Sequence, residues 1–186
     1  MKVNYIGIVT GIVAFISLVL PWWTMSASAG FEGITMSADV SIYPHQATAS
    51  AMGMSATVAM DLWFGQAALA LIIIAGIAAI VGSLIIGKTG KMVLIVAGIL
   101  ALLSIIIFAA GLQVELSKAP PVSFFPEVGL FSSGSWGYFG ASFEYSTYLS
   151  FGFWLALIAA IIAFISLSKH PTAAPTVPPT PEPETA

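Results

Sequence analysis

The stretch from Phe64 to Leu112 reads FGQAALALIIIAGIAAIVGSLIIGKTGKMVLIVAGILALLSIIIFAAGL and decides the fold. It holds two long apolar runs separated by the short segment Gly87–Lys91, and neither run contains Asp, Glu, Lys, Arg or His. A helix rises about 1.5 Å per residue, so about 20 such residues cross the roughly 30 Å hydrocarbon core of a bilayer. The pattern therefore predicts two membrane-spanning helices joined by a tight turn.

The whole chain shares this apolar character. Of its 186 residues, 59% are hydrophobic and only 7% are charged, whereas an average soluble domain has roughly 25% charged residues. So few charges cannot cover the surface of a soluble fold, and lipid as the solvent removes that requirement. We therefore expect one unit over residues 1–168, with four membrane spans at about residues 3–20, 64–86, 92–112 and 148–167.

Lysines flank the predicted spans on one side. Lys2 precedes the first span, Lys88 and Lys91 separate the second from the third, and Lys169 follows the fourth. Because cytoplasmic loops are enriched in Lys and Arg, we expect a cell-membrane protein with both termini in the cytoplasm and with segments 21–63 and 113–147 outside. Tryptophans near the outer span ends are expected to mark the membrane interface: Trp22, Trp23, Trp63 and Trp154.

One alternative concerns the first span. Lys2, the apolar run and Ala27–Ala29 together resemble a secretory signal peptide with its cleavage site. The run is long for such a peptide, and the bulky segment Pro21–Trp23 separates it from the cleavage site, so a retained helix is favoured. Cleavage would leave three spans with the same orientation.

The outer segments carry the alternation of apolar and polar residues that half-buried strands show. The first segment predicts strands over Ile34–Ile42 and Met52–Leu62, joined through a turn at Tyr43–His45. In the second, which is rich in aromatic residues and glycine, Ser132–Ser135 is a turn signal between two candidate strands. An isolated hairpin is marginal in water. The predicted fold is therefore an all-α four-helix membrane bundle with a small antiparallel β-sheet formed by both outer loops.

The C-terminal tail, residues 169–186, has a different composition. It is rich in Pro, Thr, Ala and Glu and has no aromatic residue, so it cannot bury a core. We expect a disordered cytoplasmic extension. Its repeated prolines could bind a partner domain, although a solvated chain end is the simpler interpretation.

Small residues recur at helical spacing inside the predicted spans and favour close helix packing. They are Gly7 and Gly11 in the first span, Ala78 and Gly82 in the second, and Gly152, Ala156 and Ala160 in the fourth. Packing within one bundle is the default interpretation. Homodimerisation through the GxxxG pair Gly7 and Gly11 is the alternative.

Several motifs have chemistry-bearing residue types but the wrong context. Gly82–Thr89 formally matches a phosphate-binding loop, yet it lies at the end of a span instead of following a strand. The predicted topology places His45 and His170 on opposite sides of the membrane, and Asp61 and Glu115 form a weak candidate for a cation site. We expect no nucleotide, nucleic acid, metal or other cofactor to bind.

The chain also lacks the groups that membrane catalysis and transport use. It has no cysteine, which excludes disulfides, thiolate nucleophiles and cysteine metal sites. None of the predicted spans carries an ionisable side chain, whereas transporters and proton relays usually place such groups inside the membrane. These absences argue against an enzyme and against a transporter or pore that works alone.

The topology resembles that of the claudin/PMP22-like tetraspan membrane proteins, in which a left-handed four-helix bundle carries an outer sheet assembled from both loops. The element Asp61-Leu62-Trp63 is similar to the Gly-Leu-Trp element of that family, without the paired cysteines that follow it there. The resemblance covers residues 1–168 and implies the architecture and a role in adhesion, barriers or partner binding. No functional residue is carried over.

These observations predict a multi-pass, non-enzymatic structural or interaction protein that presents an extracellular β platform. Its partners would be the lipid bilayer and a protein, or a second copy bound through the outer loops. The alternative is an accessory subunit of a membrane transporter, channel or enzyme complex whose charged residues belong to another chain.

Overall fold

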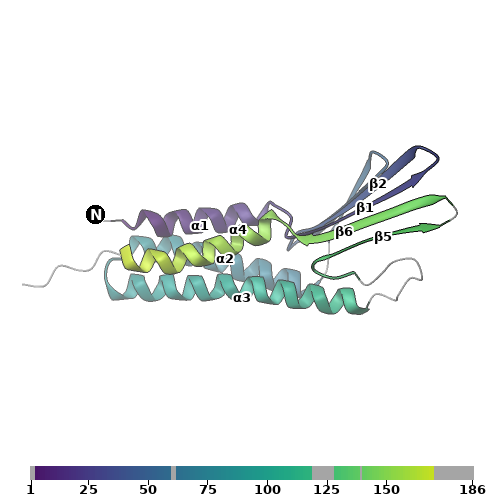
Figure 1. Ribbon diagram of the computed structural model, residues 1–186. Coiled ribbons are helices and arrows are strands. Elements are labelled where there is room, and N and C mark those ends of the chain that lie inside the picture. The colour runs from purple at the N-terminus through teal and green to yellow at the C-terminus, as the bar shows by residue number, and fades with distance from the viewer. Residues whose placement is uncertain (1–2, 60–61, 119–127, 139, 170–186) are drawn as a thin grey trace, which may run out of the picture.

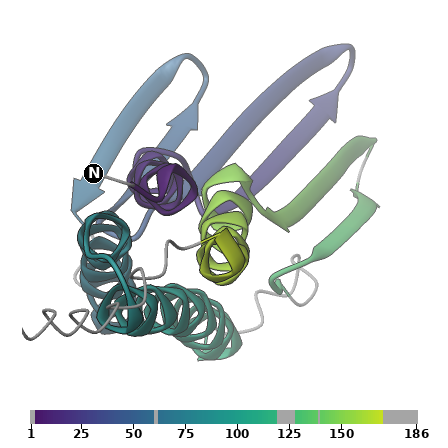
Figure 2. The same ribbon diagram turned by 90° about the vertical axis from the view of Figure 1, so that its left-hand side faces the viewer.

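The structure is a computed structural model and describes residues 3–59, 62–118, 128–138 and 140–169. Within these residues four α-helices run side by side (Figure 1). They are α1 (Tyr5–Leu18), α2 (Trp63–Leu84), α3 (Lys88–Lys118) and α4 (Phe151–Ser166), the last followed by a 3-10 turn, η1 (Leu167–Lys169). Both α1 and α3 pack against α2 and α4, so the helices form a ring in cross-section (Figure 2). The expected set of four helices is confirmed.

The helices differ in length. By length and composition, α2 with 22 residues and α3 with 31 are long and apolar enough to cross a membrane. α1 and α4 are also apolar but have only 14 and 16 residues. The predicted span 148–167 becomes helical only at Phe151, because Tyr148 and Leu149 still belong to a strand. The structure itself thus supports membrane association through α2 and α3, and four spans stay a prediction.

The strands form one antiparallel sheet at one end of the helices and extend away from them (Figure 1). They are β1 (Trp23–Phe31), β2 (Ile34–Ile42), β3 (Gln46–Ala51), β4 (Met54–Ala59), β5 (Ser132–Tyr138) and β6 (Ala141–Leu149). Their order across the sheet is β4-β3-β2-β1-β6-β5. Because β1 pairs with both β2 and β6, the two outer segments share one sheet, which confirms that prediction.

Two details of the predicted sheet are wrong. The expected strand Met52–Leu62 is present over Met54–Ala59 but starts two residues later, because Met52 and Gly53 form a two-residue turn with φ angles of 52° and 78°. Residues 60 and 61 lie outside the described residues. Two positive φ angles suit the twist of antiparallel strands. Ser132–Ser135 is no turn but pairs with β6, and the chain turns nearer Gly140, whose φ is 80°. The turn at Tyr43–His45, between β2 and β3, is confirmed.

A continuous core joins the sheet to the helices. Trp22 is fully buried and makes edge-to-face ring contacts with Phe108 at 5.0 Å and Phe153 at 6.2 Å. Trp23, at the start of β1, belongs to the same cluster. The backbone joins the layers too, since Trp22 N donates to Ile42 O at 2.8 Å. The base of the sheet is therefore fixed to the bundle, while its far end projects beyond it.

Candidate interaction surface

The two ends of the bundle differ in chemistry. The end opposite the sheet, here called the turn end, carries the α2–α3 turn with Lys88 and Lys91 at the start of α3. Lys169 ends η1 near the same end, and Lys2 lies outside the described residues. Lys118, at the sheet end of α3, forms an ion pair with Glu115 at 2.7 Å.

At the turn end Asn4 ties three helices together through its side chain and its backbone. Asn4 accepts a hydrogen bond from Gly7 N at 3.4 Å as the N-cap of α1, and its amide nitrogen donates to Ser166 O at 3.0 Å. Its backbone nitrogen donates to Ser83 O at 3.1 Å. Asn4 therefore joins α1 to α2 and to α4 in a place where no strand does so.

The small residues predicted to pack helices lie mostly inside the bundle. Added β-carbons at Gly7 and Gly11 would meet α2, the first at Ser83 Oγ and the second 2.7 Å from Gly76 O. Gly82 faces α3 in the same way. Other predicted members are Gly152 against Leu20 and Pro21, the fully buried Ala156 and Ala160, and the half-buried Ala78. Because α2 already covers the face of α1 that carries Gly7 and Gly11, a second copy cannot pack there, and the alternative of homodimerisation through that face is wrong.

The predicted interface tryptophans divide into two pairs. Trp63 and Trp154 are 65% and 44% exposed near the sheet end of α2 and α4. Trp22 and Trp23 are 0% and 3% exposed, so their assignment to the membrane interface is wrong. Both are core residues because the chain turns from helix into strand at this point and buries them under the sheet.

Among the described residues, the remaining motifs lack the neighbouring strand or side chains that their chemistry would need. Gly82–Thr89 is the end of α2, a turn with Gly87 at φ 90° and the start of α3, so no strand precedes it. His45 is exposed beside Tyr43. Asp61 and His170 lie outside the described residues, within which no three His, Cys, Asp or Glu side chains gather. Ala27–Ala29, the alternative cleavage site, lies within β1 and pairs on both sides.

The outward faces of all four helices are apolar. We call this surface the apolar girdle: Tyr5, Val9, Ile12 and Ile16 on α1; Ile74, Ile77, Val81 and Leu84 on α2; Met92, Ile95, Val96, Ile99, Leu103 and Ile106 on α3; Phe151, Trp154, Ile158, Ile161, Phe164 and Ile165 on α4. Polar side chains are buried instead, among them Thr10, Ser17 and Ser104. The pattern is the reverse of that in a soluble bundle.

The sheet has one apolar and one polar face, because side chains alternate along each strand. The apolar face carries Trp23, Met25, Ala27, Ala29 and Phe31 of β1, Ile34, Met36, Ala38, Val40 and Ile42 of β2, Met54, Ala56 and Val58 of β4, and Phe143 and Tyr145 of β6. The polar face is mainly Ser and Thr, with Asp39 and Glu144. In β1, β2 and β6 the apolar face is buried near the bundle and open toward the tip, where Ile34 is 62% exposed.

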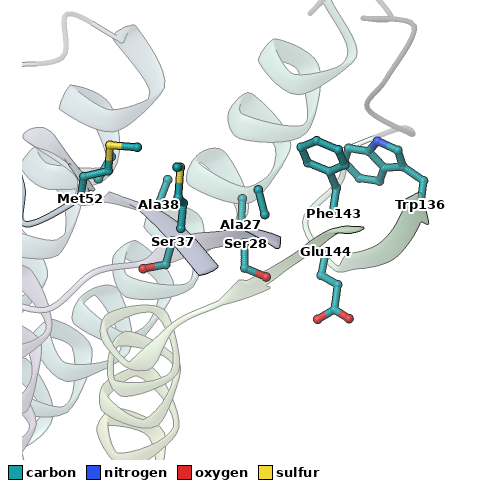
Figure 3. A pocket seen from close by; sticks show the side chains of 11 residues that line it. Ala27, Ser28, Ser37, Ala38, Met52, Trp136, Phe143 and Glu144 are labelled. Atoms are coloured by element: carbon teal, nitrogen blue, oxygen red, sulfur yellow. The ribbon is translucent and has the colours of Figure 1, made fainter. Parts of the chain in front are cut away.

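A hollow of about 270 Å³ lies on the apolar face, and we call it the trough. Its floor consists of alanines in β1, β2 and β3, namely Ala27, Ala29, Ala38 and Ala51. One wall is formed by Met36 and Met52, and the other by Trp136 and Phe143, whose rings stack at 5.3 Å. Ser28, Ser37 and Glu144 also border it, but their side chains point to the opposite face (Figure 3). The trough was not predicted from the sequence.

The outer edge of β4 is open. All six residues from Met54 to Ala59 are exposed, and β4 is the last strand on its side of the sheet. Ala51 and Met54 flank the two-residue turn and form a hydrogen-bonded pair, so with alternating pairs the N–H groups of Ser55, Thr57 and Ala59 point outward. Natural sheets usually protect such edges with charged residues, especially Lys, or with Pro. β4 contains none of these.

Comparison with protein-family profiles and with curated proteins of known function finds no match for this chain. Its function is therefore argued from the apolar girdle, the two-faced sheet and the open edge.

Proposed function

We propose that the chain is a multi-pass cell-membrane protein with four spans and that it acts as a non-enzymatic interaction protein. The turn end with its lysines faces the cytoplasm, and the sheet stands outside as a platform for another protein. The resemblance to claudin/PMP22-like proteins agrees with this architecture and stays a prediction.

The observation that carries the membrane placement is the apolar girdle. Its exposed side chains belong to α1 and α4 as well as to the two longer helices. An uninterrupted apolar surface of this extent is unfavourable in water and normal in lipid. α1 alone is about 21 Å long, but Val19, beyond its end, is 71% exposed and extends the apolar surface. A bilayer also thins locally around short spans.

The absence of cysteine allows a direct test of orientation, because any introduced cysteine is the single thiol. Thr35→Cys places it on the sheet and Thr89→Cys at the turn end, and both positions are exposed. With a membrane-impermeant maleimide on intact cells, we expect Thr35→Cys to be labelled and Thr89→Cys to be labelled only after permeabilisation. Labelling in the reverse order contradicts the orientation, and recovery of both variants in the soluble fraction contradicts membrane insertion.

The partner pairs with β4 through the main chain. The outward N–H groups of Ser55, Thr57 and Ala59, with the matching carbonyls, offer a template for one more strand, a known mode of peptide recognition. Main-chain pairing requires no special side chains on β4, which agrees with its simple sequence MSATVA.

A proline substitution at position 57 tests whether the partner binds β4 through its main chain or through its side chains. Thr57→Pro removes one outward N–H without breaking a hydrogen bond to β3, because proline is tolerated on the open side of an edge strand. With a photo-crosslinker on Ser55→Cys in native membranes, we expect the adduct to be lost in Thr57→Pro. It should persist in the matched control Thr57→Val, which keeps the N–H and the branched shape.

Two results would contradict pairing through β4. One is an adduct that survives Thr57→Pro, and the other is recovery of uncrosslinked monomer alone. An unchanged melting curve for Thr57→Pro in detergent would show that loss of the adduct does not reflect unfolding.

A further inference from the structure

The trough lies on the apolar face, away from the open edge of β4, and its shape is built by the register of the sheet. At the level of Ala29, the residues across the sheet run Trp136, Phe143, Ala29 and Met36. A small residue in the centre with bulky residues on both sides makes a channel at Ala29, and its floor continues across the neighbouring strands through Ala38 and Ala51. Ala27 continues the floor toward the bundle.

The chemistry of the trough restricts what it can hold. Its walls are thioether and aromatic side chains, and the polar side chains at its border point to the other face (Figure 3). An extended peptide would bring backbone N–H and C=O groups that need partners, and the one polar group on the walls of the trough is the indole N–H of Trp136. A hydrocarbon chain has no such requirement. Methionine walls also adapt to irregular apolar shapes.

The size agrees with a single chain. A volume of about 270 Å³ is several times the roughly 30 Å³ that one water molecule takes up in the liquid. A methylene group is similar in size to a water molecule, so the trough has room for a run of several methylene groups.

We propose that the trough binds one acyl chain of a membrane lipid, partly withdrawn from the outer leaflet. This inference rests on the proposed membrane placement, which sets the sheet beside a bilayer. Ala27 and Ala29 lie four and six residues along β1 from Trp23 at the bundle, or roughly 13 and 20 Å at about 3.3 Å per residue. The platform would thus hold the chain clear of the membrane surface.

The test uses the full chain in nanodiscs that contain a phosphatidylcholine with a diazirine in its acyl chain. We expect photo-labelling of trough residues, above all Met36, Met52 and Phe143. Ala29→Leu fills the channel and should lower this labelling at least about tenfold, equivalent to removing roughly two buried methylene groups from the contact. The matched control Ser28→Leu adds the same side chain to the polar face and should leave labelling unchanged.

Failure of this inference is distinguishable from failure of the membrane placement. Labelling of girdle residues such as Ile99 and Ile106 with none in the trough overturns the acyl-chain site and leaves the four spans intact. Absence of label from the girdle overturns both. Labelling of the trough only by a free diazirine fatty acid, and not by the phosphatidylcholine, also overturns the proposal.

Discussion

Replacing Gly11 with leucine is expected to destabilise the bundle by about 3 kcal/mol or more, because an overpacked interface cannot relax. An added β-carbon at this position lies 2.5 Å from Ile80 Cγ1 and 2.7 Å from Gly76 O. The second atom is helix backbone, so α1 and α2 must move apart to admit the side chain. Leucine favours the helix by less than about 1 kcal/mol over glycine, which does not offset the clash.

Thermal unfolding in detergent measures this effect. For a chain of this size we expect the Tm of Gly11→Leu to fall by roughly 10 °C. Ala70→Leu is the matched control, because Ala70 is exposed on the outward face of α2 and the new side chain meets only lipid or detergent. Equal melting temperatures for Gly11→Leu and the native chain would show that the α1–α2 contact is looser than the structure describes.

The sequence is sufficient to predict the helices because a long apolar run can form all its backbone hydrogen bonds within one helix, independently of the neighbouring segments. The predicted helix ends are less accurate where a helix meets the sheet. Strand β6 leads almost directly into α4, so the apolar residues Tyr148 and Leu149 belong to the strand although they continue the helical run. Hydropathy alone does not distinguish a helix from a strand that precedes it.

Strand β1 carries the alternation of apolar and polar residues that is typical of a strand, although the sequence analysis predicts no strand there. Trp23, Met25, Ala27, Ala29 and Phe31 alternate with Thr24, Ser26, Ser28 and Gly30. Alanine is a weak strand former, and the pair Trp22 and Trp23 at the end of an apolar run predicts a membrane interface. Only the pairing of β1 with both β2 and β6 shows it to be the central strand.

The trough could not be predicted from the sequence, because it also depends on which strands pair. Trp136 and Phe143 are at least one hundred residues from Ala29 and Met36, and they become neighbours only through the pairing of β1 with β6. A shift of one residue in that register would place Phe143 on the polar face. Local alternation predicts which residues share a face of one strand, but not which strands lie side by side.

Replacing Asn4 with alanine is expected to destabilise the fold by about 2 kcal/mol, from loss of a helix cap and of a buried hydrogen bond. At the sheet end α1 and α4 are held together by the pairing of β1 with β6. At the turn end the side chain of Asn4 forms the bridge, with its amide donating to Ser166 O at 3.0 Å. Asn4→Ala removes this bridge and leaves a buried carbonyl without that donor.

A second variant separates the two roles of Asn4. Asn4→Ser keeps an acceptor for Gly7 N and so preserves the cap, but its shorter side chain cannot reach Ser166 O. We expect melting in detergent to fall by about 5 °C for Asn4→Ala and about half as much for Asn4→Ser. Equal losses for both variants would mean that the cap contributes nothing. No loss in Asn4→Ser alone would mean that the cap carries the whole effect and that the bridge between α1 and α4 does not hold the turn end closed.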